Sequence, residues 1–148
     1  MINDNLKVKG RVSLELRDSQ GNIKETQEIN NLVVTDGLEY IASRMEGTTD
    51  SVMSHMGLGS GSTAAAAGDT ALETELGRVS LTSTAVSGAV VTYTASFGAG
   101  TATGAVTEAA ILNAASSGTM LCRTVFSTVN KAADDTLSVT WTVTISAS

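Results

Sequence analysis

Residues 6–17 read LKVKGRVSLELR, and this stretch decides the fold class because apolar residues take every second position. The other positions carry Lys, Arg, Ser and Glu, and Gly10 falls in the apolar series. Such alternation is typical of a strand with one buried face. It returns near the C-terminal end of the sequence and predicts a second long strand there, with its inward positions at Leu137, Val139, Trp141, Val143 and Ile145.

The residues between these two stretches predict shorter strands separated by turns. Strands are expected at 23–29, 79–87, 89–97, 106–112 and 120–129, with Asn30–Asn31 ending the first of them. A helix is expected near residues 36–46, capped by Thr35 or Asp36 and ended by Gly47, and a helical turn at 70–76. The pattern favours a mainly β fold, an antiparallel β-sandwich of the jelly-roll kind. We expect a single domain over residues 1–148, with a short N-terminal arm at residues 1–5.

Composition argues against several classes of protein. The chain has 148 residues, a formal net charge of -6 and one cysteine. An acidic chain with no run of Lys and Arg is not expected to bind nucleic acid, since phosphate contacts need clustered positive charge. No apolar stretch approaches the roughly 20 residues of a membrane span. A single cysteine cannot form an internal disulfide.

Residue types that carry chemistry occur without the partners that catalysis needs. His55 is the only histidine and has no motif around it, and Cys122 alternates within a predicted strand as a small buried residue would. The run Gly57–Gly61 lacks the Lys-Ser/Thr pair of a phosphate loop. We therefore expect no enzyme, no cofactor, no metal and no small-molecule substrate.

Charge is unevenly distributed along the sequence. Residues 79–148 carry only five charged side chains, at Glu108, Arg123, Lys131, Asp134 and Asp135. Two interpretations remain open: a neutral, hydroxyl-rich sheet surface, or a half of the molecule that faces other proteins. Glu108 lies in an apolar stretch, and we expect a structural role for it, with Arg78 or Arg123 as its partner.

Three segments, occurring together and in order, resemble those of a known group of proteins. They are NLVVTDGLEYIASRM (31–45), MGLGSGSTAAAAGDTALETELGR (56–78) and TEAAILNAASSGTMLCRTVFSTVNKAADDTLSVTWTVTI (107–145). This order resembles small β-sandwich virion proteins of tailed bacteriophages. One departure is Asn113-Ala114, where a bulkier and more acidic start to the turn is expected.

The resemblance implies structural work in the virion. The expected function is that of a capsid cement or decoration protein, which bridges neighbouring major capsid protein subunits on the outer shell and associates with itself as a homodimer or homotrimer. A tail-fibre, baseplate or adaptor subunit is the alternative, and a carbohydrate-binding module is a third. We expect partner contacts from the arm and from the glycine-rich loop 57–68, at Met1, Ile2, Asn3, Asp4, Asn5, Gly57, Gly59, Ser60, Gly61 and Ser62.

Overall fold

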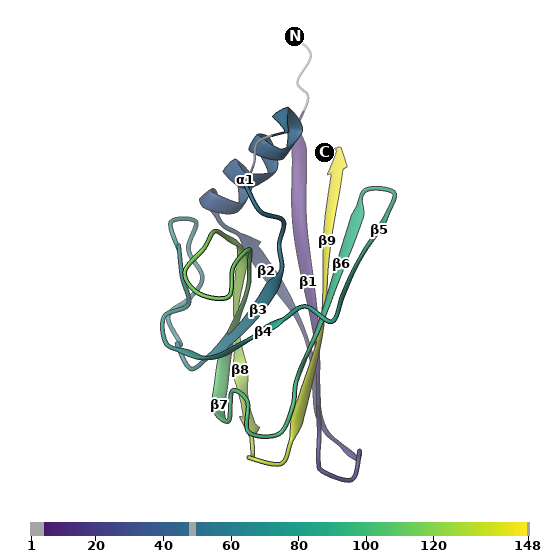
Figure 1. The fold of residues 1–148 in the computed structure, drawn as a ribbon, viewed down its shortest axis with the longest axis vertical. Coiled ribbons are helices and arrows are strands. Elements are labelled where there is room, and N and C mark those ends of the chain that lie inside the picture. The colour runs from purple at the N-terminus through teal and green to yellow at the C-terminus, as the bar shows by residue number, and fades with distance from the viewer. Residues whose placement is uncertain (1–4, 48–49, 148) are drawn as a thin grey trace.

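A computed structural model describes residues 5–47 and 50–147, which form nine strands and one helix (Figure 1). The predicted mainly β, antiparallel class with one short helix is confirmed. In chain order the elements are β1 (Leu6–Arg17), β2 (Ile23–Val33), α1 (Thr35–Glu46), β3 (His55–Gly59), β4 (Glu75–Ser80), β5 (Ser83–Ser87), β6 (Val90–Phe97), β7 (Gly104–Leu112), β8 (Met120–Lys131) and β9 (Thr136–Ala147).

All nine strands belong to one antiparallel sheet, curled into a half-barrel, in the order β4-β3-β7-β8-β2-β1-β9-β6-β5. The pairing of β1 with β9 runs from Leu6↔Ala147 to Arg17↔Thr136. By contrast, β2 meets β8 only through Leu32↔Arg123 and Val33↔Cys122. This short contact joins the two halves of the sheet, which face each other in Figure 1. The predicted sandwich and jelly roll stay predictions.

The core lies inside the curl and takes side chains from both halves. The inward residues are buried from Gly10 to Leu16 in β1 and from Leu137 to Val143 in β9, as their alternation predicts, and Trp141 is 0% exposed. Toward the other end of this pair Leu6 is 66% exposed and Ile145 is half-buried. They belong to one hydrophobic cluster with residues of β3, β7 and β8, such as Met56, Ile111 and Phe126. Burial of this apolar area is the main favourable contribution to folding.

Helix α1 packs on β8 through its backbone. Gly37 is its buried residue, and a Cβ atom there would lie 2.0 Å from the carbonyl oxygen of Leu121. The helix ends as predicted at Gly47, which adopts the left-handed conformation with φ 79°. The predicted cap at Thr35 or Asp36 is wrong: the N-cap is Val34, whose side chain makes no capping hydrogen bond. Met45, in the last turn of the helix, is 84% exposed.

Two further local predictions are corrected by long-range pairing. Asn30–Asn31 does not end the second strand, because Asn31 pairs with Gly10 of β1 and β2 continues to Val33. A Cβ atom at Gly10 would lie only 1.5 Å from Asn31 Oδ1, so the missing side chain leaves the room that Asn31 occupies. The predicted helical turn near Thr70–Glu73 is also absent, and the Glu73 carboxylate accepts the backbone N–H of Ser62 instead.

Candidate interaction surface

The C-terminal half of the described chain buries nearly all of its charge. From residue 79 to residue 147, Glu108, Arg123, Lys131 and Asp135 are at most 3% exposed, and Asp134 is the one exposed charged side chain. Burying a charge is costly unless it is paired and hydrogen-bonded. Each of the four must therefore have an internal partner, and the outer surface of this half is left almost uncharged.

Glu108 is held in β7 by four donors. Its Oε1 accepts Arg123 Nε at 3.0 Å and the Glu73 N–H at 2.9 Å. Its Oε2 accepts the N–H groups of Gly61 and Thr74, both at 2.8 Å. Both carboxylate oxygens are thereby satisfied, which is what a fully buried carboxylate requires.

Arg123 connects this carboxylate to the segment that follows β3. Its Nη1 donates to Asp69 Oδ2 at 2.9 Å, and its Nη2 donates to the Thr63 carbonyl at 3.0 Å. Together Glu108 and Arg123 bind residues 61–74 to the face of β7 and β8. The ion pair thereby fixes a loop whose largest apolar side chain is Leu72.

The glycines expected to contact a partner are used inside the molecule. Gly57 and Gly59 lie buried in β3, so the predicted loop 57–68 begins only after Gly59. A Cβ atom at Gly59 or Gly61 would lie 2.5 or 2.4 Å from Glu108 Oε2. The close backbone approach that glycine permits therefore serves the carboxylate. Ser60 and Ser62 are exposed.

The remaining predicted positions are distributed over the molecule. Met1, Ile2, Asn3 and Asp4 lie outside the described residues, and Asn5 is exposed.

Arg78 does not reach Glu108. It pairs with Glu75 at 2.6 Å and donates to the carbonyls of Ala114 and Ser117, both at 3.0 Å, so it fixes the loop before β8.

The two residues weighed as possible nucleophile or base lie in strands. His55 Nδ1 lies 2.8 Å from Ser54 Oγ, and its Nε2 lies 3.4 Å from Ser80 Oγ. Cys122 is 0% exposed, and burial raises the pKa of its thiol well above the ordinary value. A buried thiol held in its neutral form is a poor nucleophile.

Two buried charges of opposite sign lie near the turn between β8 and β9. Lys131 Nζ donates to the Gly98 carbonyl at 2.8 Å, and burial lowers the pKa of this amine. Asp135 accepts Lys24 Nζ at 2.7 Å and the Ala132 N–H at 2.9 Å, and these bonds hold the pKa of the carboxyl below its usual value. The sequence does not point to the burial of these two charges, because turn chemistry alone already accounts for an Asp here.

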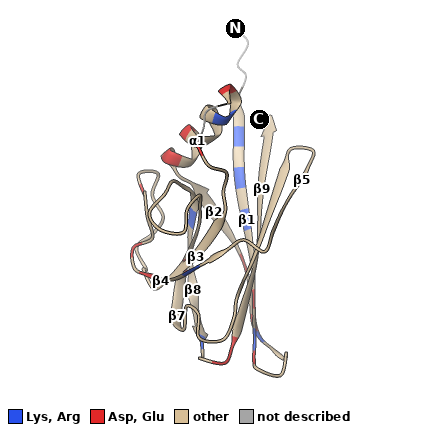
Figure 2. Cartoon of the chain, viewed as in Figure 1, with Lys and Arg blue, Asp and Glu red and all other residues tan. Residues whose placement is uncertain are grey.

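The outer face of β9, β6 and β5 is the surface that this burial leaves uncharged. The register places Thr142 beside Thr92, and Thr92 beside Ala85, so hydroxyl and methyl groups line the three strands. Figure 2 shows these strands free of charge and β1 marked by basic residues. On β1, Lys9 and Arg11 lie opposite Thr144 and Thr142 of β9. The face is thus a hydroxyl-rich area with one basic border.

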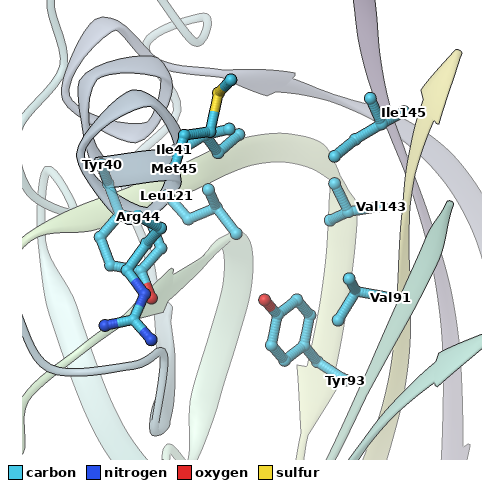
Figure 3. A pocket seen from close by; sticks show the side chains of 9 residues that line it. All are labelled: Tyr40, Ile41, Arg44, Met45, Val91, Tyr93, Leu121, Val143 and Ile145. Atoms are coloured by element: carbon cyan, nitrogen blue, oxygen red, sulfur yellow. The ribbon is translucent and has the colours of Figure 1, made fainter. Parts of the chain in front are cut away.

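An apolar groove opens between α1 and the sheet. It encloses about 310 Å³, and its lining residues are Tyr40, Ile41, Arg44, Met45, Val91, Tyr93, Leu121, Val143 and Ile145 (Figure 3). Desolvation here raises the pKa of Tyr93 to about 12.

The described residues contain no group of three or more His, Cys, Asp or Glu side chains that could hold a metal ion.

Comparison with known proteins found no match among family models, curated proteins or solved structures. In the described part of the chain, no helix has the length and apolar character needed to cross a membrane. The uncharged outer face of β9, β6 and β5 is the candidate interaction surface.

Proposed function

We propose that the protein is a non-enzymatic structural subunit of a bacteriophage virion, a capsid cement or decoration protein that binds across neighbouring major capsid protein subunits. The observation that carries the proposal is the burial of charge after residue 78, which leaves Asp134 as the exposed charged side chain of that described half. Depletion of charge is a compositional mark of the centre of protein interfaces. The resemblance of three ordered segments to phage virion proteins supports a place in the virion.

The placement of the aromatic residues supports this proposal over a carbohydrate-binding module. Trp141 and Phe97 are 0% exposed, Phe126 is 8% exposed, and Tyr40 and Tyr93 are half-buried. Sugar recognition relies on aromatic planes presented to the ligand as apolar contact area. The chain has no other aromatic side chains with which to build such a platform.

For the finer architecture we propose a sandwich-like arrangement, with the jelly roll as its predicted connectivity. Its support is that β2 joins the two halves through two residue pairs, while one hydrophobic cluster takes side chains from both. Two facing layers around a shared core are the usual solution for antiparallel sheets.

The test compares phage particles with and without the protein. A binder of the assembled shell stabilises that shell by mass action. Particles that lack the protein should release DNA at a lower temperature than complete ones, and purified protein added back should restore their resistance. Electron cryo-microscopy of the complete particle should locate the protein on the capsid. Equal heat resistance would contradict the proposal, and a location on tails alone would favour the tail-fibre, baseplate or adaptor alternative.

A further inference from the structure

The sheet ends at β5, which among the described residues pairs with β6 alone and leaves its other edge without a strand partner. All five residues of β5 are exposed, and Val86 is 72% exposed. Residues 81–89 contain no charged residue and no proline, whereas β4, at the other end of the sheet, carries Glu75 and Arg78. Natural proteins guard edge strands with charge, proline or bulges, since an open edge invites another strand to pair.

The hairpin that joins β5 to β6 determines which backbone groups are open. Ser87 pairs with Val90 across a two-residue turn, and Gly88 at its first central position has φ 59°. Such a turn is flanked by a hydrogen-bonded pair, and hydrogen-bonded and non-hydrogen-bonded pairs then alternate. Ser83, Ala85 and Ser87 therefore direct their backbone groups to β6. Thr84 and Val86 direct theirs to the open side.

We propose that β5 pairs with β5 of a second copy of this chain, antiparallel and about a two-fold axis at Ala85. This register sets Thr84 opposite Val86 of the second copy, and the reverse, so the four open N–H and C=O groups of each strand find partners. Ser83 then lies opposite Ser87 of the second copy. The two-fold axis sets Ala85 opposite its own copy, and the uncharged sequence STAVS imposes no like-charge repulsion.

The second copy is the favoured occupant because the edge is complementary to itself in both backbone and side chains. A two-fold contact uses the same patch on both partners. Of the registers that set open residues opposite one another, the one that pairs Thr84 with Val86 finds partners within β5 for both open residues of each copy. It also covers part of Val86, which a monomer leaves in water. The inference rests on the proposed function, because it names the homotypic partner of the uncharged face.

The experiment measures self-association of the purified chain and assigns its surface. Sedimentation equilibrium over a concentration series should show a reversible dimer. Amide hydrogen exchange at Thr84 and Val86 should slow as concentration rises, while that at Ser60 and Ser62 should not change. A monomer throughout the series overturns the inference, as does a dimer that leaves the Thr84 and Val86 amides unprotected.

Variants that carry opposite charges at Val86 test the proposed register, alone and as a mixture. Val86→Lys and Val86→Glu should each weaken self-association by about tenfold or more, because the two-fold axis brings like charges close together. A mixture of the two variants should associate again as a heterodimer. Thr140→Lys is the matched control, since Thr140 is exposed on the outer face of the internal strand β9, and it should dimerise as the wild type does. Failure of the mixture to associate contradicts the pairing.

The outcome is separable from that of the proposed function. Val86→Lys that remains folded and monomeric can be added to stripped particles. If the wild type dimerises through β5 but neither form binds particles, the cement proposal fails and the pairing stands. If the wild type is monomeric and still restores heat resistance, the pairing fails and the cement proposal stands.

Discussion

Arg123 Nε lies 3.0 Å from Glu108 Oε1, and the two side chains are 2% and 0% exposed. The pair bridges adjacent strands β7 and β8, and through Asp69, Thr63 and three backbone N–H groups it fixes the segment 61–74. A buried charge pair of this kind stabilises the fold only as long as both members are present.

Removing one member of the pair should therefore be strongly destabilising. Arg123→Met leaves the Glu108 carboxylate buried with only backbone donors, and we expect a loss of about 3–5 kcal/mol in the free energy of unfolding. Urea denaturation followed by circular dichroism measures it. The matched control is Arg11→Met, which breaks the exposed pair between Arg11 and Glu28 and should cost less than about 1 kcal/mol. Equal effects of the two variants would contradict a structural role for the buried pair.

The close packing of α1 on β8 gives a second prediction. Gly37→Ala places a methyl group against the Leu121 carbonyl, which cannot move without disturbing the strand, so we expect a loss of about 1–3 kcal/mol or more. Gly68→Ala is the control, because a Cβ atom there meets nothing within 4 Å. Thermal unfolding of both variants checks the difference. A stable Gly37→Ala protein would show that the helix is free to move away from the sheet.

Acid stability should depend on Asp135. Its pKa is lower in the folded protein than in the unfolded chain, because Lys24 and the Ala132 N–H bond to the carboxylate. Its contribution to stability is therefore complete above the unfolded value of about 3.9 and is lost as the pH falls through the folded value. Asp135→Asn should flatten the decline of unfolding free energy between about pH 5 and pH 2. Asp134→Asn, at the exposed neighbouring position, is the matched comparison, because it changes the same kind of side chain and leaves the bonds from Lys24 and Ala132 to Asp135 in place.

The single tryptophan reports on the core. Trp141 is completely buried between the two halves of the sheet, so its fluorescence emission should be blue-shifted and poorly quenched by acrylamide. Trp141→Ala should cost about 3–5 kcal/mol, and Trp141→Phe less, because the smaller change in volume leaves a smaller cavity. Emission typical of water would be incompatible with the arrangement of β9 beside β1.

The long strands could be predicted from the sequence because their burial repeats with the period of the backbone. In β1 and β9 each inward position is apolar and each outward one polar, so local pattern and tertiary burial agree. Of the two arginines expected as partners of Glu108, the structure places Arg123 there and Arg78 on Glu75.

The errors fall where distant residues override local preference. Asn30–Asn31 reads as a break, yet Gly10 gives Asn31 a place in the sheet. Thr70–Glu73 reads as the start of a helix, yet the Glu73 and Thr74 N–H groups bond to Glu108. Gly59 and Gly61 read as loop residues that contact a partner, and instead they leave room for the buried Glu108 carboxylate. Each of these features depends on a contact between residues that lie tens of positions apart in the sequence, and local propensity carries no information about such contacts.

The pairing of β1 with β9 has a consequence for how the chain is made. These strands lie in the middle of the sheet but at opposite ends of the described sequence, and the hairpin of β5 and β6 joins the sheet through β9. During synthesis, β1 therefore leaves the ribosome long before its neighbour β9 exists, whereas its other neighbour, β2, follows it directly. Pairings between remote segments form slowly because loop closure costs entropy first. The nascent chain must keep its alternating apolar strands from associating with those of other chains until β9 has emerged, and a copy that ends before β9 cannot complete the sheet.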